Sequence, residues 1–112
     1  MGDRAQIRFI FEDGKDVFFY THWGAHELPE DLSNALRRGE DRWDDEEYLA
    51  RIIFCEMIQS DVLGTTGAGI GTGVHGDLNR PLITVDTRTK TVNLGEGSGD
   101  IPFVDYCNMF PQ

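Results

Sequence analysis

Two histidines and a tryptophan are the first side chains of this sequence that could do chemistry. His22 and His26 stand four residues apart, a spacing that lets two imidazoles hold one metal ion on a helix. Gly24 lies between them and Pro29 follows shortly after, so the segment reads as a loop instead of a helix. We therefore predict no metal site here, and expect His22 and Trp23 to contribute to a ligand-binding loop.

A glycine-rich segment supplies the second group of candidates. Positions 64–76 contain six glycines and three threonines, and positions 71–76 formally match G-x-G-x-x-G, but no helix pattern follows that match. The stretch 64–69 could instead present backbone N–H groups and hydroxyls to an anion, or could simply be a flexible loop that leads into a strand. The candidate binding residues in this segment are Thr65, Thr66, Gly67 and Gly69.

An acidic cluster surrounds Arg42 and Trp43, with six carboxylates in positions 40–47. The alternating oxygen ligands and turn glycine of a calcium loop are missing, so we predict a solvated helix N-terminus without a metal. Trp43 either packs as a staple at the start of the helix or stacks on a planar ligand. In the second case Arg42 and Arg51 could hold the ligand beside it.

Catalytic signatures are absent from the sequence. No serine or cysteine lies in a nucleophile motif, and Cys55 and Cys107, the only cysteines, form no C-x-x-C pair. Paired carboxylates could serve a hydrolase, but acids are so abundant that this pattern carries little information. We therefore assign no catalytic residues, expect no cofactor, and favour binding over turnover.

The elements that must position these residues follow from patterning. An Asp-Gly turn between two β-favouring runs predicts a hairpin, and two helical patterns with acidic starts follow it. A second hairpin pattern comes after the glycine-rich segment. We predict an α+β fold of about five mostly antiparallel strands, in two hairpins, with two helices packed on one face. The expected strands are 6–11, 16–21, 69–75, 81–86 and 90–94, and the expected helices are 29–38 and 45–60.

The chain length of 112 residues fits one domain, which we place at residues 1–95. Residues 96–112 are expected to form a glycine-rich linker and an apolar tail that docks on the core or on a partner chain. Self-association through this tail or through a sheet edge would make the protein a homo-oligomer. The candidate partner-binding residues of the tail are Ile101, Phe103, Tyr106, Met109 and Phe110.

Charge limits the possible partners. The chain has 20 acidic and 10 basic side chains, a formal net charge of −10, which would repel a nucleic-acid backbone. No apolar run approaches the length needed to span a bilayer, and no signal peptide is visible at the N-terminus. We expect a cytoplasmic protein that binds neither nucleic acid nor membranes.

Two groups of motifs carry a resemblance. The segments Tyr20-Thr21-His22-Trp23-Gly24 with Glu27-Leu28-Pro29, and Arg42-Trp43-Asp44-Asp45 with the run 48–54, resemble a family of small uncharacterised proteins encoded by phages, archaeal viruses and prophages. The likeness spans about residues 3–95 and includes the Gly67-Ala68-Gly69-Ile70 stretch. That family has no assigned activity, so the resemblance implies a viral setting and no site residues.

In a viral setting, small non-enzymatic proteins often occupy something that belongs to the host. Our first hypothesis is an accessory, anti-defence protein in the cytoplasm of an infected cell that sequesters a small nucleotide-type signalling ligand. The alternative is an acidic nucleic-acid mimic that blocks a basic surface of a host defence protein, as anti-CRISPR proteins do. A second alternative is a virion or assembly component held by the apolar tail.

Overall fold

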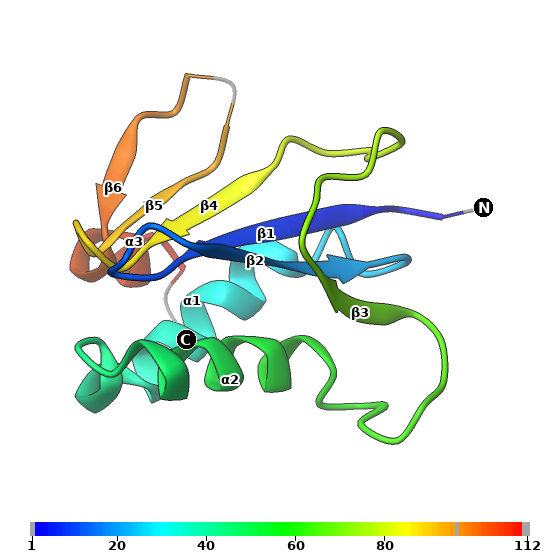
Figure 1. The fold of residues 1–112 in the computed structure, drawn as a ribbon, viewed down its shortest axis with the longest axis horizontal. Coiled ribbons are helices and arrows are strands. Elements are labelled where there is room, and N and C mark those ends of the chain that lie inside the picture. The colour runs from blue at the N-terminus through cyan, green and yellow to red at the C-terminus, as the bar shows by residue number, and fades with distance from the viewer. Residues whose placement is uncertain (1, 96, 111–112) are drawn as a thin grey trace.

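A mixed six-stranded sheet forms the centre of the molecule in the computed structural model, which describes residues 2–95 and 97–110 (Figure 1). The strands run in the order β3-β2-β1-β4-β5-β6, and every neighbouring pair is antiparallel except β1 and β4, which are parallel. The strands are β1 (Ala5–Ile10), β2 (Asp16–Thr21), β3 (Ala68–Gly71), β4 (Ile83–Asp86), β5 (Thr91–Asn93) and β6 (Asp100–Pro102).

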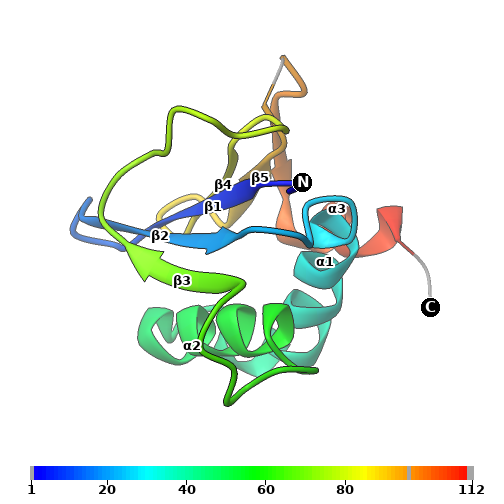
Figure 2. The same ribbon diagram turned by 90° about the vertical axis from the view of Figure 1, so that its right-hand side faces the viewer.

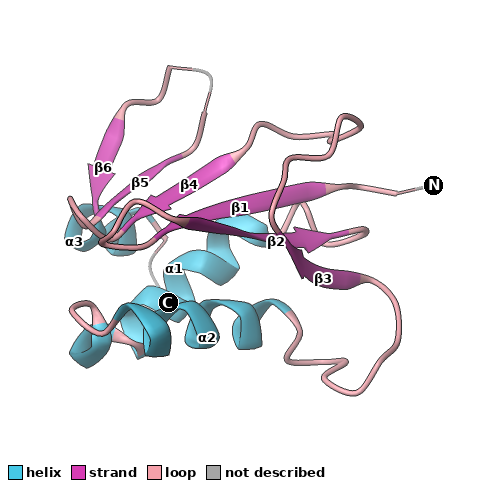
Figure 3. Ribbon diagram, in the orientation of Figure 1, coloured by secondary structure: helices cyan, strands magenta, loops and turns pink. Residues whose placement is uncertain are grey.

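The helices gather on one side of this sheet, as Figures 2 and 3 show. Alternation along β1 directs Ile7 and Phe9 to that side, where both are fully buried. Leu32, Leu36 and Ile53 from the helices complete the same apolar cluster. The helices are α1 (Leu28–Arg38), α2 (Glu46–Met57) and α3 (Phe103–Met109), with a short 3-10 turn at Glu40–Arg42.

Local chemistry explains where the first elements begin and end. The β1–β2 hairpin turns at Gly14, whose φ of 88° lies in the left-handed region that glycine adopts without strain. The helix α1 has Pro29 in its first turn and two acids behind it, while Arg37 and Arg38 occupy its last turn, in agreement with the helix dipole. These elements match the predicted hairpin and first helix closely.

The opposite face of the sheet is crossed by the connection from β3 to β4. This segment, residues 72–79, is called the strap below; in Figure 2 it arches over β2 and β1 on the side away from the helices. The buried side chain of Gln6 holds it, since its Nε2 donates to the Gly73 carbonyl at 3.0 Å and its Oε1 accepts from the His75 N–H at 3.0 Å. Asn79 fixes the far end through paired bonds with the Arg4 backbone.

The predicted α+β class is confirmed, and the element count needs correction. Where we expected about five strands and two helices, the described residues form six strands and three helices. The additional pair, β6 and α3, lies in the segment predicted as linker and tail. Its strand has only three residues and its helix seven, too few for a periodic pattern to stand out. Glu96, where the predicted linker begins, lies outside the described residues.

The apolar tail packs on the core of its own chain. Phe103 and Tyr106 are fully buried, and the Tyr106 hydroxyl donates to the Pro29 carbonyl at 2.6 Å. Arg37 donates to the Cys107 carbonyl at 2.7 Å and so ties α3 to the end of α1. Ile101 and Phe110 pack partly buried against the same cluster, whereas Met109 remains half exposed. Most of the apolar groups that suggested a partner chain are therefore used within the chain.

Among the described residues, no helix combines the length and the apolar character that crossing a membrane requires.

Candidate functional site

A shallow groove of about 290 Å³ brings together several of the predicted ligand-binding residues. It lies where β2 ends and β3 begins, on the edge of the sheet. One wall comes from the end of β2 and the loop after it, and the other comes from the start of β3 and the loop before it. The lining residues are Tyr20, His22, Trp23, Thr66, Gly67, Ala68 and Gly69.

Aromatic side chains form a continuous row along this groove. The Trp23 and His22 rings meet edge to face with centroids 4.6 Å apart. The His22 Nδ1 and the Tyr20 hydroxyl are 3.0 Å apart, within hydrogen-bond distance. The other side of Tyr20 stacks on His75 of the strap, with centroids 4.5 Å apart and ring planes inclined by 28°. The row therefore joins the groove to the strap.

Gly67 leaves the space that the Trp23 ring occupies. Its φ of +98° is a conformation that other L-residues rarely adopt, and a Cβ at this position would lie 3.0 Å from the Trp23 ring. Its carbonyl accepts a hydrogen bond of 2.8 Å from the His22 N–H, which extends the β2–β3 ladder by one pair. A glycine is thus required for the indole to pack this closely against the backbone of the loop.

The chemistry of the groove is that of a stacking surface. Trp23 is 55% exposed, which is unusual for the largest side chain, so a large part of its ring is accessible to a planar group. Gly69 leaves open space beside it. The Thr66 hydroxyl supplies a polar group, and none of the described Asp, Glu, Lys or Arg residues lines the groove. An aromatic ring with hydrogen-bonding edges suits these walls.

Other residues predicted to bind the ligand lie apart from this groove. Trp43 donates from its Nε1 to the Leu36 carbonyl at 2.9 Å and packs edge to face on Phe103. Arg42 pairs with Asp45 at 3.0 Å, and Arg51 lies exposed on α2. Thr65 precedes the groove without lining it. Of the two roles considered for Trp43, the structure shows the packing one.

Sequence reasoning did not include Tyr20, Ala68 or His75 among the ligand-binding residues. Tyr20 could have been found, because it stands two residues before His22 and alternation along a strand directs both to one face. His75 could not, since its place opposite Tyr20 depends on the path of the strap across the sheet. Among the described residues, no group of three or more His, Cys, Asp or Glu is arranged to hold a metal ion.

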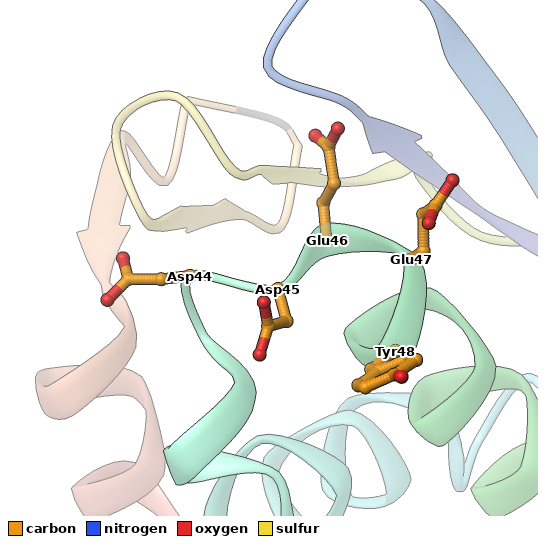
Figure 4. Close-up of a pocket in the computed structure, with 5 residues that line it drawn as sticks. All are labelled: Asp44, Asp45, Glu46, Glu47 and Tyr48. Atoms are coloured by element: carbon orange, nitrogen blue, oxygen red, sulfur yellow. The ribbon is translucent and has the colours of Figure 1, made fainter.

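The acidic cluster at the start of α2 surrounds a second hollow, drawn in Figure 4. Its carboxylates diverge and several have partners of their own. Asp44 pairs with Lys90 at 2.9 Å, Asp45 pairs with Arg42, and Glu46 accepts a hydrogen bond from the Glu12 N–H of the β1–β2 turn. This arrangement fastens the start of α2 to the hairpin and to the β4–β5 turn.

The titratable groups with shifted pKa values lie outside the groove. Burial raises the pKa of the Cys107 thiol, which keeps it protonated and unreactive. Burial also raises the pKa of Tyr106, whose hydroxyl serves as a donor to Pro29. Burial, with nearby Glu27 and Glu56, raises the pKa of Asp31 on α1 to about 6. Burial is the largest cause of all three shifts, which therefore follow from packing.

A comparison of the chain with protein-family models, with curated proteins and with solved structures finds no significant match.

Proposed function

We propose that this protein binds a small nucleotide-type ligand in the Trp23 groove and sequesters it without changing it chemically. The observation that carries the proposal is the exposed Trp23 ring, packed close to Gly67 with His22 and Tyr20 beside it. Stacking on an aromatic side chain is the usual way in which proteins hold an unpaired base, because every base has a π-face.

The walls also indicate how such a ligand would lie. Its base stacks on Trp23, while its polar groups reach the Thr66 hydroxyl. No Lys or Arg lines the groove, and the molecule carries a net charge of −10. A nucleotide with few negative charges is therefore favoured over a triphosphate.

The viral setting comes from the resemblance of the sequence motifs. On that basis we propose an accessory, anti-defence role in the cytoplasm of an infected cell, in which the ligand is a signal of the host. Binding without turnover is consistent with the groove, where no described acid or thiol lies beside the stacking surface.

Native mass spectrometry of protein purified from phage-challenged cells is the first test, followed by denaturation and identification of any released small molecule. A bound nucleotide is expected. Titration with cyclic and linear mononucleotides and dinucleotides, followed by calorimetry, then measures the affinity. Trp23→Ala should weaken binding about tenfold or more, since one base stack is worth about 1–3 kcal/mol. Tyr48→Ala is the matched control, because Tyr48 is equally exposed but lies on α2.

A second candidate function is favoured by the exposed carboxylates between α1 and α2. Asp44 is 87% exposed in its side chain and Asp45 is 52% exposed, in a molecule of net charge −10. Such a surface could mimic nucleic acid and block a basic host protein. The two functions differ in their salt dependence: affinity for a basic partner falls steeply with ionic strength and is unaffected by Trp23→Ala. If native mass spectrometry shows the protein without a bound small molecule, and a basic host protein binds it with an affinity that falls with salt, the second proposal replaces the first.

A further inference from the structure

The outer edge of β3 presents backbone groups that the sheet does not use. The His22 N–H donates to the Gly67 carbonyl, and the register pairs Tyr20 with Gly69 and Phe18 with Gly71. Hydrogen bonding alternates along an antiparallel pair, so these glycines direct their N–H and C=O groups toward β2. Ala68 and Ile70, the residues between them, therefore direct theirs away from the sheet.

The opposite edge of the sheet is closed to strand pairing. It is formed by β6, where Pro102 has no N–H to donate and Asp100 adds an exposed charge. The chain then turns directly into α3. Proteins commonly guard sheet edges in this way, with proline, charge and short strands. The edge at β3 has neither proline nor charge.

The stretch of chain that contains β3 is also uncharged. Residues 62–76 contain no Asp, Glu, Lys or Arg, although the whole chain carries 20 acids and 10 bases. Two copies of a molecule with a net charge of −10 repel each other, and that repulsion is weakest where neither surface carries charge. Ile70 on this edge is 60% exposed, and Leu63 in the loop before it is 93% exposed. These are apolar groups that a partner surface would cover.

We propose that β3 pairs antiparallel with β3 of a second copy of this chain, around a two-fold axis at Gly69. In this register Ala68 of each copy lies opposite Ile70 of the other, and all the outward N–H and C=O groups of both residues find partners. The large Ile70 side chain then lies beside the small Ala68 side chain of the second copy. Gly69 faces its own counterpart, and a glycine pair permits the close approach that this position requires.

Self-complementarity is the reason to choose a second copy over another extended peptide. When a strand pairs with the same strand of a second copy, all its outward N–H and C=O groups find partners only if the residues that carry them lie symmetrically about the two-fold axis. Ala68 and Ile70 lie symmetrically about Gly69. The pairing would join the two sheets into one and place both Trp23 grooves on the same face, on either side of the axis. The inference does not depend on what the groove binds.

Sedimentation velocity over a range of protein concentrations tests the proposal, together with hydrogen exchange of single amides. We expect a reversible monomer–dimer equilibrium that strengthens with added salt, because salt screens the repulsion between the copies. The amide hydrogens of Ala68 and Ile70 should exchange more slowly as the fraction of dimer rises. Ile70→Lys and Ala68→Pro should each weaken dimerisation about tenfold or more, the equivalent of about 1.4 kcal/mol.

The controls separate this interface from other effects. Val104→Lys makes the same change as Ile70→Lys at an equally exposed site on α3, and should leave the dimer intact. Ala68→Pro removes only an outward N–H, so the β2–β3 ladder and the thermal unfolding temperature should be retained. A monomer at all concentrations would overturn the proposal. So would a dimer that both edge variants leave unchanged, or one that Val104→Lys disrupts equally.

Discussion

The pKa of Asp31 shows how neighbouring carboxylates act on a single residue of this acidic chain. It lies on the first turns of α1, where partial burial and the carboxylates of Glu27 and Glu56 raise its pKa from 3.8 to about 6. Between these two pH values the folded protein keeps a proton that the unfolded chain has released. Stability therefore falls as the pH rises through this window, and above about pH 6 the charged carboxylate remains unfavourable.

Replacing this carboxyl with an amide should remove the penalty. We expect Asp31→Asn to raise the free energy of unfolding by about 1 kcal/mol at pH 8, an amount discounted for the partial exposure of the side chain. At pH 4 the gain should shrink, because the wild-type carboxyl is then largely protonated in the folded state. Urea unfolding at both pH values measures the difference. An equal gain from Asp31→Asn at both pH values would contradict the assignment.

At the same scale, sequence reasoning found part of the groove and misplaced the rest. His22, Trp23, Thr66, Gly67 and Gly69 were predicted to bind a ligand, and the structure brings them to one groove. Their association could be anticipated because a strand end and a glycine-rich loop both expose polar and aromatic groups. Arg42 and Trp43 lie at the end of the 3-10 turn and Arg51 lies on α2, away from this groove, and composition and spacing do not encode that separation.

Among the elements, α3 is short but buries large side chains in the core. Its seven residues bury Phe103 and Tyr106 completely, and the Tyr106 hydroxyl reaches back to the Pro29 carbonyl at the start of α1. A helix this short is not stable alone, so its structure depends on these contacts. The helix in turn closes the end of the core between α1 and β5.

Removing the Tyr106 hydroxyl should therefore loosen α3. We expect Tyr106→Phe to lower the free energy of unfolding by about 1 kcal/mol, because the ring still fills its site but the Pro29 carbonyl loses its partner. Thermal or urea unfolding gives the magnitude, and limited proteolysis should cut near α3 sooner in the variant. Val104→Ala, on the exposed side of the same helix, serves as control. An unchanged unfolding curve for Tyr106→Phe would show that the bond contributes nothing.

Elements with a strong pattern were predictable and short ones were not. The first hairpin and the helices α1 and α2 lie within a few residues of their predicted bounds, since alternation, helical spacing and turn glycines agree there. By contrast, β6 and α3 follow glycines whose positive φ values turn the chain, and their few residues repeat no period. Burial against α1 determines their structure, and that information is spread over the whole chain.

For the whole molecule, the high net charge should lower the stability of the folded state. A charge of −10 on a domain of this size produces self-repulsion that favours expansion of the chain. We expect the unfolding temperature, measured by calorimetry at low protein concentration, to rise by about 3–5 °C between low salt and about 0.5 M NaCl. Choline chloride should act equally, because screening does not depend on which cation is present. A rise with sodium alone would point to specific cation binding instead.

The topology also belongs to this scale, and it was the least predictable feature. We expected mostly antiparallel neighbours joined as two hairpins, and the β1–β2 and β4–β5 hairpins are present. The parallel pairing of β1 with β4, which joins the two hairpins into one sheet, has no local signature. It depends on the strap crossing the sheet, and on the bonds that Gln6 makes to hold it there.

That parallel pair has a consequence for how fast the protein folds. Ile7 aligns with Ile83, so the central ladder joins residues separated by most of the chain, and a large loop must close before this contact gives any stabilisation. Local structure such as the first hairpin can form within microseconds. Its strand β1 can pair with β4 only after the large loop has closed. Refolding should accordingly take milliseconds to seconds, and changes in β4 should slow it more than changes in α2.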